Sequence, residues 1–138
     1  MVNSEDLYIM GINEFNEDLF RMGNASSPSF SEARGLKDCL VVLIDGIQIV
    51  RANRNGFSAF NSITSVMKRK GKNVWKIKKG TTLEDIIIVK DTRLGHEGHY
   101  MLVPSKDMPF KKYLGILEEF GLDKSKCVKL TPTEIANG

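Results

Sequence analysis

The sequence contains no long hydrophobic run. The longest apolar runs are Ile86–Val89 and Leu40–Ile44, far short of the ~20 residues that cross a bilayer. The N-terminus has no basic segment followed by an apolar core, so no Sec-type signal is expected. These absences predict a soluble protein with no membrane partner, cytoplasmic in the cell that makes it.

Cysteine and net charge are also low. Cys39 and Cys127 are the two cysteines of the chain. Their spacing is not that of metal ligands, and two cysteines are too few for a disulfide scaffold. The sequence leaves open whether they form a single disulfide with each other. Cys39, just before an apolar run, is expected to be a buried, inert strand residue. Lys and Arg total 20 and Asp and Glu 17, a net charge of +3, whereas dedicated nucleic-acid-binding domains are usually more basic.

Common nucleotide and metal motifs are missing. No Walker loop is present, and no Gly-x-Gly-x-x-Gly segment opens a helix. His96 and His99 stand three residues apart around Gly98, whereas the metalloprotease helix needs a spacing of four to place both imidazoles on one face. The neighbouring sequence offers no third ligand, so we expect no metal site.

The remaining composition is that of one soluble domain. Of 138 residues, 41% are hydrophobic and 27% charged, within the ordinary range. No internal repeat is present, so residues 1–138 are treated as a single domain. Six strands are predicted, at Leu19–Met22, Cys39–Ile44, Ile47–Val50, Val74–Ile77, Ile86–Lys90 and His99–Val103, and Val128–Leu130 is a candidate for a short last strand. Asp45-Gly46 between two β-branched runs predicts a type I′ hairpin.

Two helices are predicted. Apolar residues recur at helical spacing from Phe57 to Met67, and this pattern ends in a basic cluster and Gly71. A second helix is predicted from Pro109 to Gly121, capped by Asp107. Residues 24–35 are expected to be a loop, and residues 1–19 either a helix or an irregular lead-in. The sum is an α+β fold with about six strands in a largely antiparallel or split sheet and two or three helices.

Several polar residues are candidates for a site, each with a structural alternative. Ser58 either caps a helix or binds an anion or ribose. His99, beside Tyr100 at a strand start, either faces a cleft as acid, base or hydrogen-bond donor or is solvated. Arg21 in its strand either holds a phosphate or points to solvent. Lys68–Lys72 with Trp75 could contact nucleic acid, but lysines at such places usually form a solvated face.

Five segments occur in a characteristic order. They are Arg21 in Leu-Phe-Arg, then 55–60 (Asn-Gly-Phe-Ser-Ala-Phe), 79–83 (Lys-Gly-Thr-Thr-Leu), 89–91 (Val-Lys-Asp) and 98–104 (Gly-His-Tyr-Met-Leu-Val-Pro), followed by Met108 and a helix. Across residues 19–120 or so, this order resembles the second exported effector family of the type VI secretion system. These are small bacteriostatic toxins with an ADP-ribosyltransferase fold.

The resemblance implies a split β-sandwich that holds NAD across a cleft and transfers ADP-ribose, or hydrolyses NAD, in the cytoplasm of a target cell. Ser58 and His99 match the hydroxyl and histidine positions, which makes them the expected catalytic residues. Arg21 matches the basic residue on the first strand that grips NAD, and Arg34 a further arginine of the family. Either Phe57 or Tyr100 is expected to pack on the nicotinamide ring.

The sequence also departs from the family pattern. Phe57 stands where the toxins have threonine, and no glutamate opens the strand of His99, although Glu97 lies just upstream. Three possibilities therefore stay open: chemistry without that glutamate, a role for Glu97, or a retained fold without catalysis. The alternative function is an RNA-binding or RNA-cleaving toxin that uses Lys68–Lys72, Trp75 and His99. A toxin of this kind implies a macromolecular acceptor and an immunity protein that covers Ser58 and His99.

Overall fold

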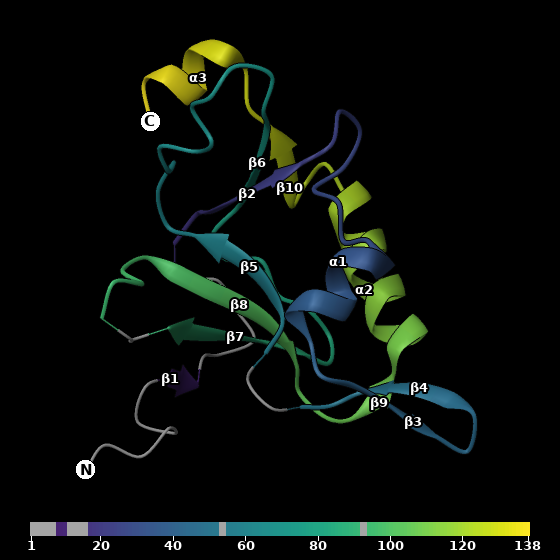
Figure 1. Ribbon diagram of the computed structural model, residues 1–138. Helices are drawn as coiled ribbons and strands as arrows, with labels where there is room; N and C mark the ends of the chain where they lie inside the picture. The colour runs from purple at the N-terminus through teal and green to yellow at the C-terminus, as the bar shows by residue number, and fades with distance from the viewer. Residues whose placement is uncertain (1–7, 11–16, 53–54, 92–93) are drawn as a thin grey trace.

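In the part of the chain that the computed structural model describes, two antiparallel sheets and three helices form (Figure 1). It describes residues 8–10, 17–52, 55–91 and 94–138. Within these residues the larger sheet has the strand order β1 (Tyr8–Met10), β7 (Ile86–Asp91), β8 (His99–Pro104), β5 (Phe57–Phe60), β2 (Leu19–Gly23), β6 (Asn73–Ile77) and β10 (Cys127–Lys129). The smaller sheet comprises β3 (Val41–Ile44), β4 (Ile47–Val50) and β9 (Met108–Pro109), and the helices are α1 (Glu32–Asp38), α2 (Phe110–Leu122) and α3 (Pro132–Ala136). The predicted α+β class with antiparallel strands is confirmed.

The β3–β4 hairpin forms as its turn sequence predicts. Ile44 pairs with Ile47 across the turn. Asp45 and Gly46 have φ angles of 50° and 79°, the positive values that a type I′ turn requires at both central positions. This local signal correctly placed two of the strands.

The larger sheet opens between β2 and β5. These two strands share a single aligned pair, Phe20 with Phe60, whereas β2 is paired along its whole length with β6 on its other side. Continuing the register would place Met22 opposite Ser58, yet the strands separate before that point. The opening leaves backbone groups of β5 available to partners other than β2.

Helices α1 and α2 cover one face of the larger sheet (Figure 1). Phe57, Phe110 and Tyr113 are completely buried between the helices and the strands. The approach of α1 depends on Gly35, because a Cβ there would lie 2.7 Å from the Phe110 ring. This face is the main hydrophobic core.

A smaller core lies on the opposite face of the sheet. Met67, Val74 and Leu130 are buried there, with Phe60 and Ile135 packed against them. Ile135 belongs to α3, the short C-terminal helix at the top of Figure 1. A third cluster, with Val89, Met101 and Val103 buried, packs β7 against β8.

The helix predicted from Phe57 onward is wrong. Phe57 and Ala59 are fully buried while Ser58 and Phe60 are partly exposed, the two-residue alternation of a strand. The segment is β5, which pairs with β8 along its length. Pairing with strands distant in sequence therefore overrides a helical spacing of apolar residues. The chain beyond Ser65 forms turns instead, and Gly71 ends them at φ 81°.

Other local predictions also need correction. Residues 32–35, expected in a loop, begin α1, and Ser31 caps it by accepting from the Arg34 amide. Asp107 does not cap α2; its carboxylate accepts from the Ala52 amide and pairs with Arg51. Cys39 ends α1 rather than lying in a strand. Both cysteines are buried and free, so the disulfide left open does not form.

The N-terminal segment is only partly described. Tyr8–Met10 is a strand that pairs with β7, so the helical alternative is wrong for these residues. Residues 1–7 and 11–16 lie outside the described part of the chain. The predicted strand near Val128 is confirmed as β10.

Candidate functional site

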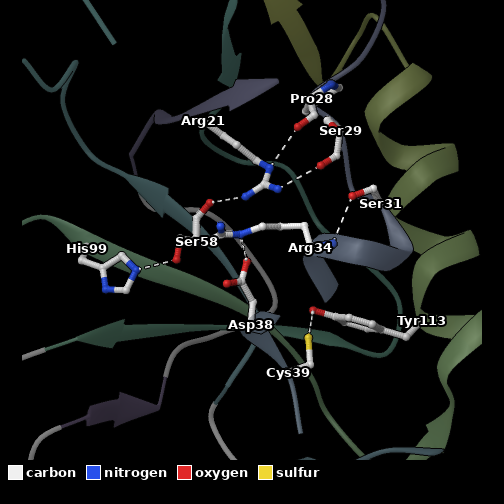
Figure 2. A network of polar contacts seen from close by, with 10 residues as sticks. All are labelled: Arg21, Pro28, Ser29, Ser31, Arg34, Asp38, Cys39, Ser58, His99 and Tyr113. Atoms are coloured by element: carbon white, nitrogen blue, oxygen red, sulfur yellow. Dashed lines mark hydrogen bonds and ion pairs between the residues drawn. The ribbon is translucent and has the colours of Figure 1, made fainter. Parts of the chain in front are cut away.

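Arg21 occupies the opening between β2 and β5. Its Nη1 donates to the carbonyl of Ser58 at 2.8 Å, on the edge of β5 that β2 leaves unpaired. The Nε and Nη2 groups donate to the carbonyls of Pro28 and Ser29 at 3.0 and 2.9 Å. Figure 2 shows all three bonds spreading from one guanidinium. Arg21 thus ties β2, β5 and the loop before α1 together.

The charge of Arg21 is held in an aromatic setting. The guanidinium carbon lies 4.8 Å from the Phe30 ring centre and 5.0 Å from that of Phe57, within the range of cation–π attraction. Arg21 is only 8% exposed, and burial lowers its pKa to about 10. It therefore stays protonated at neutral pH. Carbonyl oxygens carry no net charge, so the three acceptors orient the cation without neutralising it.

Ser58, His99 and Asp91 form a hydrogen-bonded chain on the face of the sheet that carries the smaller core. The Ser58 Oγ lies 2.8 Å from Nε2 of His99, and Nδ1 of His99 lies 2.8 Å from Oδ2 of Asp91. A carboxylate only accepts, so Nδ1–H donates to Asp91; in the neutral imidazole Nε2 then accepts from the Ser58 hydroxyl. The Asp91 side chain is completely buried and that of His99 is 13% exposed. This chain fixes both the ring and the hydroxyl.

Strand register explains why these three residues meet. His99 is directly opposite Phe60, so Ser58, two positions earlier in β5, points to the same side of the sheet. The His99 ring also packs 5.1 Å from the Phe60 ring. Asp91 ends β7, the strand on the other side of β8. Three neighbouring strands each contribute one polar group.

A cavity of about 520 Å³ lies at the opening of the sheet. Its lining consists of Arg21, Met22, Gly23, Asn24, Ser29, Arg34, Ser58, Phe60, Met67 and Lys72. Three of these residues are cations and none is acidic. The volume falls in the usual range of small-molecule sites, and the charge favours an anionic ligand.

Arg34 is an exposed cation of the cavity lining. Its side chain is 55% exposed and pairs with Asp38 one helical turn later, at 2.9 Å. Figure 2 shows it reaching from α1 toward the side of Ser58. The structure therefore brings Arg21, Arg34 and Ser58 to one cavity, with His99 hydrogen-bonded directly behind Ser58.

Comparison with protein families gives a match that spans most of the chain. The family model described as Tse2 ADP-ribosyltransferase toxin matches residues 17–126. The chain belongs to the Tse2 ADP-ribosyltransferase toxin family. The match includes every residue of the cavity and of the Ser58 chain, and the two antiparallel sheets agree with the ADP-ribosyltransferase-like fold that was predicted. None of the curated proteins and none of the solved structures matches the chain.

Two aromatic residues do not reach the cavity of this Tse2-family protein. Phe57 is completely buried, with its ring stacked 5.9 Å from Tyr113. The expectation that it packs on a nicotinamide ring is therefore wrong, and it acts on the cavity only by supporting Arg21. Tyr100 follows His99 in β8, so its side chain leaves the sheet on the opposite face and packs against the main core. Burial raises the pKa of its hydroxyl, and it lies outside the cavity lining.

Asp91 and Lys72 were not among the predicted site residues. Asp91 stood in one of the five ordered segments, but its proximity to His99 depends on the β7–β8 pairing and was not predicted. Lys72 belonged to a basic cluster, and the structure separates it from that cluster by placing it in the cavity wall. Glu97 is exposed and accepts from the Gly95 amide, so it does not enter the cavity.

The alternative function, in which Trp75 helps to bind RNA, is not supported by the position of this side chain. Its side chain is 8% exposed, and its Nε1 donates to the Asn24 carbonyl at 2.9 Å. A buried ring offers no face on which a base could stack.

Among the described helices, none has the length and apolar character of a membrane-spanning segment.

The tertiary structure brings a carboxylate close to His96 and His99. One donor atom each of Asp91, His96 and His99 lies within 4.8 Å of the others. The neighbouring sequence offered no third candidate ligand, and strand pairing brings Asp91 to that position.

Proposed function

We propose that this protein binds NAD in the cavity between β2 and β5 and transfers its ADP-ribose group to a macromolecule in the cytoplasm of a target cell. Membership of the Tse2 family supports the reaction class. The main support for this binding site is the cavity itself, whose lining combines Arg21, Arg34 and Lys72 with Ser58.

The three cations suit the pyrophosphate of NAD. Arg21 provides a fixed charge, because its guanidinium is held by three carbonyls and two rings. Arg34 and Lys72 are exposed, and their side chains can move onto the phosphate oxygens. The guanidinium of Arg34 can bind two of these oxygens at once. Ser58 then bonds a hydroxyl of the nicotinamide ribose, and His99 behind it orients the Ser58 hydroxyl.

The reaction requires the nicotinamide–ribose bond to break. Its electron pair goes to the nicotinamide nitrogen, which leaves as neutral nicotinamide, and positive charge develops on the ribose. A nucleophile on the acceptor bonds to the same ribose carbon and releases its proton. If water is the nucleophile, the result is NAD hydrolysis. The protein contributes mainly by fixing the dinucleotide and stabilising the developing cation.

The cavity lining contains no glutamate to bond the ribose 2′-hydroxyl. Ser58 takes that place in the proposed complex, because Asp91 and His99 orient its hydroxyl. Transfer therefore proceeds without the glutamate of most transferases, and Glu97 has no part in it.

The test is induced expression in bacteria, with growth and cellular NAD followed together. Arg34→Ala, Ser58→Ala and Lys72→Ala are compared with Lys68→Ala, a matched control for an exposed lysine outside the cavity. We expect growth arrest and NAD loss, or new ADP-ribosylated species, with the wild type and the control only. Arrest that persists in all three cavity variants contradicts the proposal. Arrest abolished only by charge reversal at Lys68–Lys70 would favour an RNA target instead.

We propose that an immunity protein keeps the toxin silent in the cell that produces it and exports it by type VI secretion. Blocking the cavity around Ser58 and His99 would prevent NAD from entering. Hydrogen exchange on the toxin–immunity complex tests this contact: protection should concentrate on β2, β5 and α1. Protection confined to elements away from the cavity would contradict it.

A further inference from the structure

The turn between β7 and β8 brings three metal-binding side chains together. The His99 amide donates to the carbonyl of His96 at 3.1 Å, a tight turn. Gly95 and Gly98 have φ angles of 86° and 78°, which glycine adopts without strain. The two imidazole rings consequently lie 6.1 Å apart between centres, on the side where Asp91 ends β7.

Both imidazoles direct Nδ1 at one carboxylate oxygen. Oδ2 of Asp91 lies 2.8 Å from Nδ1 of His99 and 3.3 Å from Nδ1 of His96. Ligands of a tetrahedral zinc ion, each ~2.05 Å from the metal, are about 3.3 Å apart. The distance from Nδ1 of His96 to Oδ2 of Asp91 has this value. The distance from Nδ1 of His99 to the same oxygen needs to widen by only about half an ångström.

The surroundings also fit a metal site. The Asp91 side chain is completely buried, whereas that of His96 is 44% exposed, so an ion can enter from solvent beside His96. Nε2 of His99 faces the Ser58 hydroxyl at 2.8 Å. A metal-binding histidine usually donates the N–H of its second ring nitrogen to an oxygen acceptor. The Ser58 hydroxyl is such an acceptor.

We propose that Asp91, His96 and His99 bind one zinc ion, with an open fourth position for water. Two neutral imidazoles and a carboxylate are typical zinc ligands, and three protein ligands leave such a position. With its Nδ1 on zinc, His99 carries its proton on Nε2 and donates to Ser58. The direction of the Ser58–His99 hydrogen bond is then reversed from that in the metal-free chain.

The proposal is tested by calorimetric titration of zinc chloride into untagged, chelator-treated full-length protein. We expect one zinc ion per chain. His96→Ala should weaken binding at least about tenfold, the lower end of what loss of even a second-shell partner costs. Glu97→Gln is the matched control, because Glu97 lies in the same turn outside the ligand set and glutamine retains an acceptor for the Gly95 amide.

Several outcomes are decisive. Stoichiometric binding that His96→Ala weakens and Glu97→Gln does not supports the site. A wild type without stoichiometric zinc, or equal binding by the His96→Ala variant, overturns it. His96 is exposed, so the variant should unfold at the same temperature as the wild type without zinc. Cys39 and Cys127 are buried and do not compete for the ion. The readout involves no NAD and is independent of the proposed transferase activity.

Discussion

The guanidinium of Arg21 donates to the carbonyl of Ser58 at the point where β2 separates from β5. The main chain of Ser58 is thus held by a cation on one side, while its side chain is held by His99 on the other. A single residue therefore joins the charged wall of the cavity to the polar chain that ends at Asp91. Displacement of either strand would disturb both.

Arg21→Lys should destabilise the protein even though the charge is retained. An ammonium group cannot donate in the planar directions of three carbonyls or stack between two rings. We expect a loss of about 2–4 kcal/mol in the free energy of unfolding, measured with urea. Arg34→Lys, which alters an exposed pair on α1, should cost about 0.5 kcal/mol or less. Equal losses would show that the guanidinium geometry of Arg21 is unimportant.

Ser58→Ala and His99→Ala should behave as one functional unit. Each substitution alone should lower the rate of NAD turnover by ~10²-fold or more, because each breaks the same hydrogen-bonded chain. The double variant should be about as slow as either single variant. Steady-state turnover with purified protein measures all three. Multiplicative losses in the double variant would mean that the two residues act independently.

Glycine substitutions should have effects that follow the space and backbone angle at each position. Among Gly95, Gly98 and Gly115, substitution of Gly98 by alanine should destabilise the most, by about 1–3 kcal/mol, because φ is 78° and the new Cβ would lie 2.4 Å from Oδ1 of Asn61. Gly95→Ala has similar backbone strain but open space, so about 1 kcal/mol is expected. Gly115→Ala, in the middle of α2 with nothing within 4 Å, should stabilise by about 0.5–1 kcal/mol.

Thermal or urea unfolding distinguishes these three variants. The order of stability should be Gly115→Ala above wild type, then Gly95→Ala, then Gly98→Ala. A Gly98→Ala variant as stable as wild type would contradict the close packing of the β7–β8 turn against Asn61.

Both cysteines should be unreactive in the folded protein. Burial raises the pKa of Cys39 to about 11 and that of Cys127 to about 12, so about 0.1% or less of either is thiolate at pH 8. Alkylation at pH 8 should therefore be slow in buffer and rapid in urea. Rapid labelling without denaturant would contradict the burial of these thiols.

The same thiols should make stability fall in alkaline solution. Their folded pKa values lie above the ordinary value of 9.0, so above pH 9 the unfolded chain binds fewer protons than the folded one. The free energy of unfolding then decreases with pH. Urea midpoints between pH 8 and 10.5 measure the decrease. Cys39→Ala combined with Cys127→Ala should reduce that slope, and an unchanged slope would assign it to other groups.

Some features of the fold were predictable because their causes are local. The Asp45-Gly46 turn needs positive φ at two adjacent residues, which this dipeptide adopts readily. The stripe of Phe110, Tyr113 and Leu117 repeats at helical spacing, and it does form the buried face of α2. The cap of α2 was not predictable, because Asp107 finds partners in a distant segment, at Ala52 and Arg51.

The candidate site likewise has features with local causes and features that depend on long-range contacts. The sequence by itself determined the turn chemistry, most strands and the ordered motifs that indicate the Tse2 family. Long-range strand pairing makes Phe57–Phe60 a strand, since pairing with β8 outweighs the helical spacing of its apolar residues. Only the tertiary structure placed Asp91 against His99 and Arg21 against Ser58. Those contacts join residues 8 and 37 positions apart, and they depend on strand register and on the opening of a sheet, which no local pattern specifies.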